Sequence, residues 1–238
     1  MLRILFSYFF ILIYFTSDAQ LISESKNDSK MFFNQKSVLY FGVDVLHSFR
    51  ELNPNVDYLN NELGERANEI PRWMSGYSLR IAMPVLKFLK INGGIAFQQN
   101  GESYEWTSSV SDSSFSYQTS FRYIAMPIQL VVEYGNKLCF YGAFGMSPAI
   151  FNSYNQKRQW TTGMGSSSSE ETNIQDDCNS FILSFQGDLG VHYAINDFIG
   201  IQLTGQYRKQ LNNTYKEFED YIHKASALGF NFAISYQF

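Results

Sequence analysis

Large apolar side chains occupy every second position in the last twelve residues of the sequence. In ALGFNFAISYQF, residues 227–238, Leu228, Phe230 and Phe232 alternate with small or polar residues. This period of two predicts a β-strand with one apolar and one polar face. The apolar face suits either the core of a soluble sandwich or the lipid around a membrane barrel.

The same alternation begins after residue 37 and recurs eight times. The predicted strands cover residues 38–49, 73–86, 89–100, 120–134, 138–154, 180–195, 198–211 and 227–238. Lengths of about ten residues or more suit strands that cross a membrane at a tilt, and they exceed the five or six residues usual in globular sheets.

The segments between these strands fall into two kinds. Three are tight turns, at residues 87–88, 135–137 and 196–197, and four are long and polar, at residues 50–72, 101–119, 155–179 and 212–224. Short turns at one end and long loops at the other are typical of outer-membrane barrels, whose short turns face the periplasm. We therefore predict an all-β fold, an eight-stranded antiparallel up-and-down transmembrane β-barrel. A secreted soluble β-protein is the alternative.

The polar faces of the predicted strands are rich in Gly, Ser, Thr and Gln, which suits the interior of a narrow barrel. They also carry five charged residues that form the candidate site, an interior charge cluster of Asp44, Arg80, Glu133, Asp188 and Arg208. Counted from the short turns, Glu133 lies low, Arg208 lies high and the other three lie near mid-height. An unpaired interior charge is costly, so we expect Arg80 to pair with Asp44 or Asp188. The cluster indicates either a structural plug or a gated polar path.

Aromatic residues gather near the ends of the predicted strands, as the interfacial girdles of a membrane barrel require. They are Phe49, Trp73, Trp106, Tyr134, Tyr154, Trp160, Phe198, Tyr215, Tyr236 and Phe238. The terminal pair, Tyr236 and Phe238, is similar to the signal by which barrel-assembly machinery captures outer-membrane proteins. We expect Phe238 to matter more for insertion than for the finished fold.

The N-terminus has the features of a cleaved signal peptide. Arg3 precedes a short apolar stretch, and Ser17 and Ala19 occupy the small positions of a cleavage site before Gln20. The apolar stretch is shorter than the roughly 18 residues of a spanning helix, which argues against a membrane anchor. The predicted organisation is a signal peptide at residues 1–19, a polar segment at 20–37 and the barrel at 38–238.

Composition excludes some classes of function. The net charge is -4 and the sequence has no basic cluster, so we expect no nucleic-acid partner. The 17% aromatic and 17% charged residues suit a membrane interface but fit a large soluble β-domain as well.

Candidate chemistry is sparse. Three scattered histidines and the absence of hydrolase, metalloprotease or phosphate-loop motifs predict no enzyme activity, metal or cofactor. Asp220, His223 and Ser226 fit no recognisable catalytic spacing. Cys139 and Cys178 are predicted at opposite ends of the barrel, too far apart for a disulfide.

Two further local features carry predictions. Residues 163–171, GMGSSSSEE, have the composition of a mobile loop. Pro84 and Pro127 each follow an Ile-Ala-Met sequence near a short turn, and they predict bulges or locally broken pairing because proline donates no hydrogen bond.

The sequence resembles the PorT-like outer-membrane β-barrel proteins of Bacteroidota. The similar stretches are Ala19-Gln20, Tyr123-Ile124-Ala125-Met126-Pro127-Ile128, Gly187-Asp188-Leu189-Gly190-Val191, Tyr207-Arg208-Lys209-Gln210-Leu211-Asn212-Asn213 and the aromatic C-terminus. The resemblance implies an eight-stranded barrel, and for one named member a role in secretion through the type IX system.

Two hypotheses for the function follow. The first is an outer-membrane barrel with a structural or partner-binding role, as an accessory to type IX-like secretion or envelope assembly. Its expected partners are outer-membrane lipid, barrel-assembly machinery and envelope or secretion-system proteins. The second is a small pore or transporter, which the filled interior of an eight-stranded barrel disfavours.

Overall fold

The computed structural model describes residues 36–53, 70–86, 88–108, 110–165, 167–172, 177–216 and 222–238. Residues 33–238 form one compact unit, and its described part is the barrel considered below. The predicted signal peptide and most of the polar segment at 20–37 lie outside the described residues.

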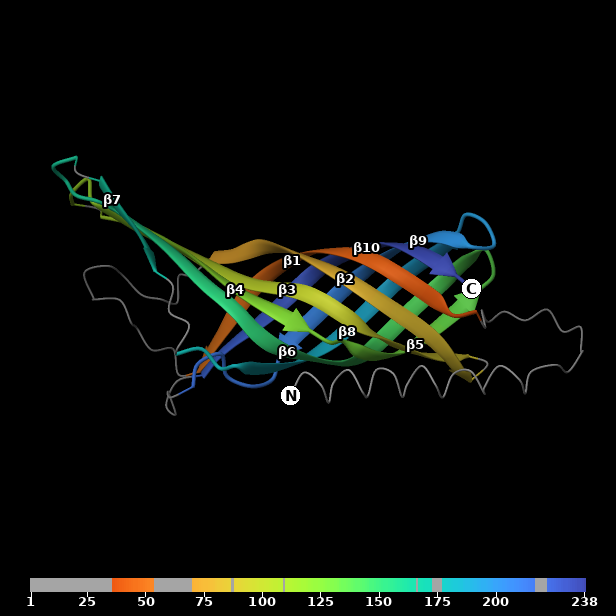
Figure 1. Cartoon of the computed structure of the whole chain (residues 1–238). Helices are drawn as coiled ribbons and strands as arrows, with labels where there is room; N and C mark the ends of the chain where they lie inside the picture. Colours follow the sequence, from red (N-terminus) through yellow and green to blue (C-terminus); the bar gives the residue numbers. More distant parts are fainter. Residues whose placement is uncertain are drawn as a thin grey trace, which may run out of the picture. The chain divides into compact units, whose positions relative to one another are not determined.

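Across these residues the chain folds into one antiparallel sheet of ten strands (Figure 1). The strands are β1 Val38–Asn53, β2 Ile70–Leu86, β3 Leu89–Thr107, β4 Ser114–Ala125, β5 Ile128–Gly135, β6 Leu138–Thr161, β7 Ser167–Thr172, β8 Phe181–Ala194, β9 Ile199–Gln210 and β10 Ile222–Gln237. The short turns lie at the predicted places, after β2, β5 and β8. The end of the barrel that carries them is called the short-turn end below, and the opposite one the long-loop end.

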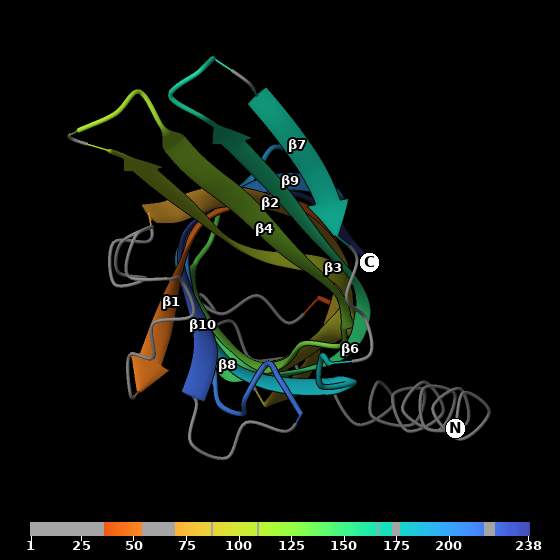
Figure 2. The same ribbon diagram turned by 90° about the vertical axis from the view of Figure 1, so that its left-hand side faces the viewer.

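The sheet closes on itself because β10 pairs with β1. Their register runs from Val38 opposite Gln237 to Asn53 opposite Ile222, and Ser37 and Phe238 exchange backbone hydrogen bonds of 3.1 and 3.0 Å. β4 and β5 occupy one position in the ring, since both pair with β3 on one side and β6 on the other. The described strands therefore make a ring of eight, and the predicted up-and-down barrel is confirmed (Figure 2).

The two prolines interrupt the ladder as predicted. Pro127 falls between β4 and β5, where the N–H of Met126 donates to the carbonyl of Pro148 at 2.8 Å. Pro84 lies at a register shift in the pairing of β2 with β3. Both interruptions follow from the missing N–H of proline.

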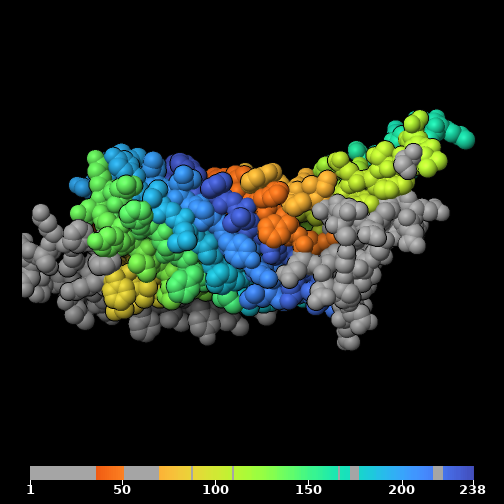
Figure 3. Space-filling view, turned by 180° about the vertical axis from the view of Figure 1, so that it is seen from behind, coloured from red at the N-terminus to blue at the C-terminus, as the bar shows by residue number. Residues whose placement is uncertain are grey.

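The outer wall of the ring is apolar, in keeping with the alternation in sequence. Phe41, Phe140, Leu189 and Phe230 are each more than half exposed, whereas their strand neighbours point inward and are small, polar or tyrosine. Figure 3 shows this wall as a continuous side-chain surface from one side. Apolar exposure of this extent needs an apolar environment around the barrel.

Beyond the long-loop end, β3, β4 and β6 continue together with β7 as a projecting sheet, made of residues 104–107, 114–119, 156–161 and Ser167–Thr172 (Figures 1 and 3). The interpretation of residues 101–119 and 155–179 as loops is therefore wrong for these parts of the chain. The mobile loop expected at 163–171 is likewise wrong for residues 167–171, because they pair with β6. Ladder pairing overrides the poor strand propensity of their serines.

The apolar face changes sides between the barrel and the projecting sheet. Trp106, Phe115 and Trp160 lie opposite one another on three strands and continue the inward face of the barrel. The stacked rings of Tyr104 and Tyr117, 5.4 Å apart, form the next row. The two tryptophans therefore belong to the projecting sheet rather than to an interfacial girdle. A reversal of this kind marks where the apolar surroundings of the wall end.

Two glycines in β8 provide a test of the close packing between strands. A Cβ on Gly190 would lie 2.1 Å from the carbonyl oxygen of Leu203 and 2.6 Å from Cα of Thr204, whereas a Cβ on Gly187 would come no nearer than 3.7 Å to the Phe185 side chain. We predict that Gly190→Ala lowers the free energy of unfolding by about 1–3 kcal/mol or more, through overpacking against backbone. Gly187→Ala is the matched control. Urea unfolding in lipid vesicles measures both, and equal effects would contradict the packing.

Candidate functional site

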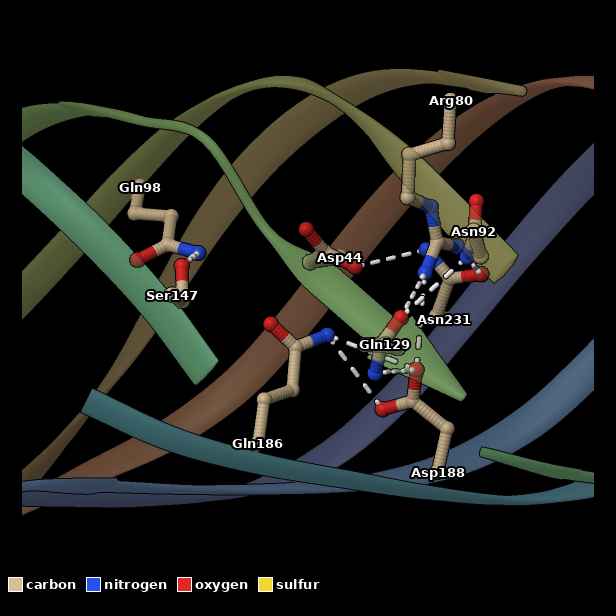
Figure 4. Close-up of polar contacts among 9 residues, drawn as sticks. All are labelled: Asp44, Arg80, Asn92, Gln98, Gln129, Ser147, Gln186, Asp188 and Asn231. Atoms are coloured by element: carbon tan, nitrogen blue, oxygen red, sulfur yellow. Dashed lines mark hydrogen bonds and ion pairs between the residues drawn. The ribbon is translucent and has the colours of Figure 1, made fainter. Parts of the chain in front are cut away.

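Polar side chains converge inside the barrel, because every second residue of each strand in the ring points inward. Figure 4 shows the middle of this interior, with side chains from opposite walls in contact. Residues Asp44, Arg80, Asn92, Gln129, Gln186, Asp188 and Asn231 are all buried there. This set is called the middle layer below.

Arg80 of β2 is the centre of the middle layer. Its Nη1 forms an ion pair with Oδ2 of Asp188 at 3.4 Å, and its Nη2 donates to Oδ1 of Asn231 at 3.1 Å. Nδ2 of Asn231 in turn donates to Oδ1 of Asp44 at 2.6 Å. Arg80 therefore pairs with Asp188, one of its two expected partners, and is linked to Asp44 through an amide.

Glutamine and asparagine side chains complete the hydrogen bonds of this ion pair. Gln129 donates to Oδ2 of Asp188 at 2.9 Å, and its own Oε1 accepts from Arg80 at 3.4 Å and from Asn92 at 3.2 Å. Gln186 donates to the carboxylate of Asp188 at 3.4 Å. Buried charges are tolerated when they are paired and further hydrogen-bonded in this way.

A second polar layer lies nearer the short-turn end. Lys90 of β3 forms an ion pair of 2.8 Å with Oε2 of Glu133, and the hydroxyl of Tyr40 donates to Oε1 of the same carboxylate at 2.7 Å. Nε2 of His192 lies 2.8 Å from Oγ of Ser235. Glu133 is thus low in the barrel, as expected, with a partner on β3 that the sequence analysis did not name.

The third layer lies toward the long-loop end. Arg208 of β9 donates to Oδ1 of Asn100 at 2.7 Å and to the carbonyl of Gln99 at 2.9 Å. Above it, Glu102 contacts Nε of Arg50 at 3.5 Å and Nε2 of His223 at 3.1 Å. Arg208 is therefore high in the barrel, and its described hydrogen bonds go to an amide and a backbone carbonyl.

An apolar cluster fills the neighbouring part of the interior. Phe121 of β4 contacts the rings of Tyr154, Tyr215 and His223 at centroid distances of 5.1, 6.2 and 5.5 Å. Tyr154 and Tyr215 were expected in an outward-facing girdle, and this is wrong, because both pack with the cluster inside. For Tyr154 the physical reason is the bulge in β6 beside Phe151, which shifts the alternation along that strand and turns the ring inward.

Two of these contacts cross the whole barrel. In the ring of eight, β2 and β8 are separated by three strands on either side, and so are β3 and β9. The Arg80–Asp188 ion pair joins the first two strands, and the Arg208–Asn100 hydrogen bond joins the second two at a greater height. Side chains therefore span the full width of the interior at two levels.

Sequence reasoning missed several members of these layers. Lys90 and Asn231 lie at inward positions of the alternation, so strand parity alone could have identified them. Glu102 and His223 fell in segments interpreted as loops, and only the true lengths of β3 and β10 place them inside. Asp220 lies outside the described residues, and Nε2 of His223 contacts Glu102.

The cysteines do not bridge. Cys139 lies at the start of β6 near the short-turn end, and Cys178 pairs with Tyr215 at the long-loop end. Burial raises the pKa of the Cys178 thiol to about 11, so it stays protonated and weakly nucleophilic at neutral pH.

In the described part of the chain, no helix is long and apolar enough to cross a membrane, and no three side chains of the metal-binding types gather.

The closed ring and its apolar wall define the class of protein: an eight-stranded up-and-down β-barrel of the kind that spans outer membranes. No protein-family model and no curated protein matches the sequence. Membership of the PorT-like family therefore stays a resemblance.

Among solved structures, the chain is similar to outer-membrane barrels. The attachment invasion locus protein Ail of Yersinia pestis matches at 15% identity and a TM-score of 0.35, over 87% of this chain and 100% of that one. Neisserial surface protein A matches at 10% and 0.37, over 86% and 98%. The N-terminal barrel domain of Pseudomonas aeruginosa OprF matches at 10% and 0.33, over 86% and 98%.

We predict that Arg80→Ala lowers the free energy of unfolding by about 3–5 kcal/mol, because it leaves the buried carboxylate of Asp188 without its cation. Asp112→Ala, at an exposed position between β3 and β4, is the control and should change it by less than about 0.5 kcal/mol. Denaturant unfolding in vesicles measures both. The double variant Arg80→Met with Asp188→Leu should recover much of the loss. Failure of the single variant to exceed the control would mean that the ion pair contributes nothing to the fold.

Proposed function

We propose that the chain is an integral outer-membrane β-barrel with a structural or partner-binding role and no catalytic activity. The observation that carries this proposal is the pairing of an apolar outer wall with an interior spanned by side chains. The wall supports residence in lipid, since a closed sheet satisfies its own backbone. Because side chains span the interior, a structural or partner-binding role is favoured over a pore.

In this proposal the short turns face the periplasm and the projecting sheet stands outside the cell, the usual orientation of such barrels. The chain is exported with a cleaved signal peptide, and barrel-assembly machinery inserts it. Outer-membrane lipid then surrounds the exposed apolar residues of the wall. The projecting sheet is the part of the described chain that reaches farthest toward surface partners.

The resemblance to PorT-like proteins supports a finer proposal, an accessory role in type IX-like secretion or in envelope assembly. Quantitative proteomics of the secreted fraction, with and without the protein, tests it. Unchanged secretion would remove this role and leave the membrane barrel itself untouched.

The alternative function, a small pore or transporter, requires a continuous polar path. The crossings from Arg80 to Asp188 and from Arg208 to Asn100 obstruct such a path at two heights. Conduction would require both side-chain pairs to separate. Separation would leave buried charges without their partners, which is costly.

We predict that the refolded protein shows no stepwise conductance in planar bilayers. It should fractionate with outer membranes and shift its position on gels when heated. A triple variant, Arg80→Ala with Asp188→Ala and Arg208→Ala, removes the crossing side chains and serves as the comparison for conductance. Steady single-channel currents from the unmodified protein would support the pore, and recovery in the soluble periplasm would overturn the membrane barrel.

A role of Tyr236 and Phe238 as an assembly signal is part of the same proposal. Both rings are about half exposed and stack on each other, with centroids 6.1 Å apart. We predict that Phe238→Ala lowers the amount of protein inserted in cells but costs the finished fold only about 1–3 kcal/mol. Phe230→Ala, a similarly exposed position on β10, is the control. Quantitative blotting of membrane fractions compares them, and equal insertion of the two variants would argue against a signal.

A further inference from the structure

β7 forms one border of the projecting sheet. It pairs with β6 along its full length, from Gln156 opposite Thr172 to Thr161 opposite Ser167, and with no other described strand. The described side chains of Ser167–Thr172 are exposed, and Figure 2 shows β7 at the outer margin of the sheet. A strand in this position presents a row of backbone N–H and C=O groups on its second edge.

In the described part of the chain, β7 lacks two of the features that protect such edges, proline and a bulge. Its sequence, SSSEET, has no proline, and its register with β6 runs without a bulge. Among its described residues, the carboxylates of Glu170 and Glu171 are the charges that hinder pairing of this edge with another chain. Since consecutive residues of a strand point to opposite faces, these two place one negative charge on each face of the sheet.

The register of β6 with β7 sets basic residues opposite these carboxylates, and Oε1 of Glu171 also accepts a hydrogen bond from Nδ2 of Asn155. Lys157 lies opposite Glu171, and Arg158 lies opposite Glu170. Two adjacent basic residues thus face the two adjacent acids, one pair on each side of the sheet. Opposite charges at directly opposed positions stabilise a strand pair, and like charges destabilise it.

We propose that β7 binds an extended, basic segment of a partner polypeptide, which adds to the projecting sheet as a further strand. Backbone hydrogen bonds supply the affinity in this mode of recognition, and side chains supply the selection. The partner would place two adjacent basic residues against Glu170 and Glu171, as β6 does on the other edge. This inference rests on the proposed membrane orientation and names the surface that the partner-binding role would use.

Other occupants fit the edge less well. A second copy paired through β7 would bring four carboxylates into neighbouring positions, which is unfavourable. An anionic polysaccharide would meet the same two charges and could not continue the backbone ladder. A basic polypeptide satisfies both the charges and the edge.

The test uses the full mature chain in lipid nanodiscs and synthetic ten-residue peptides as probes. The first peptide is a run of threonines with two adjacent lysines at its centre. The second has glutamates in place of the lysines. Two further peptides repeat the first sequence with N-methylated backbone amides, one at the odd positions and the other at the even positions. Because alternate amides of a strand point to the same neighbour, only one of these two peptides loses the hydrogen bonds donated to β7. Fluorescence anisotropy measures binding, and hydrogen exchange of residues 167–172 reports whether β7 becomes protected.

The variants separate charge from strand structure. Glu170→Lys with Glu171→Lys should weaken binding of the lysine peptide by about two- to thirtyfold, the range expected for two exposed ion pairs. Glu170→Gln with Glu171→Gln removes the charges without introducing repulsion and should give a smaller loss. Glu105→Lys with Asp112→Lys makes the same change in net charge at exposed positions elsewhere on the projecting sheet and its connection, and should leave binding unchanged.

The expected result is binding of the lysine peptide, slower exchange in β7, little binding of the glutamate peptide and loss of binding for one methylation phase. Absence of binding, equal binding of both methylated peptides, or insensitivity to the Glu170 and Glu171 variants would overturn the inference. Dimerisation of the protein through β7, seen by sedimentation, would overturn it in favour of a second copy. Membrane insertion of each variant is checked by heat modification on gels, so a lost peptide site is distinguished from a failed barrel.

Discussion

Closure of the sheet by the pairing of β1 with β10 is the constraint on which the rest of the structure depends. A ring of eight strands has a fixed and narrow width, so side chains from opposite walls come within hydrogen-bond reach. Inward positions are then small, polar and mutually paired, or apolar and packed together, as around Phe121. Outward positions are free to be large and apolar. The two faces of every strand follow from this single geometric condition.

The interior layers show how the condition is met. Arg80 and Asp188 come from strands on opposite sides of the ring, and Asn231 relays the contact to Asp44. An ion pair in such a place adds little net stability compared with well-packed apolar residues, but removal of one partner is costly. The network therefore penalises a shifted register, because a shift by one residue would turn each of these side chains toward lipid.

The sequence was a good guide wherever one alternating face met a tight turn. The ring, its short turns, both proline interruptions and the heights of Glu133 and Arg208 were all predictable, because period two and turn length are local signals. Partners such as Asn231 were not, since ring position and register decide which inward side chains meet. β7 was missed for another reason: its serines have poor strand propensity, and only the neighbouring β6 makes them a strand.

The length of β6 has a mechanical consequence. Its 24 residues run without a break in the chain from the short-turn end into the projecting sheet, a span of about 80 Å at the usual rise per residue. A force applied to the border of that sheet along the strand direction would act on many ladder hydrogen bonds at the same time, in shear. It would not break them one after another. The projecting sheet is thus continuous with the wall of the barrel through β6, and the wall would carry tension applied to the sheet.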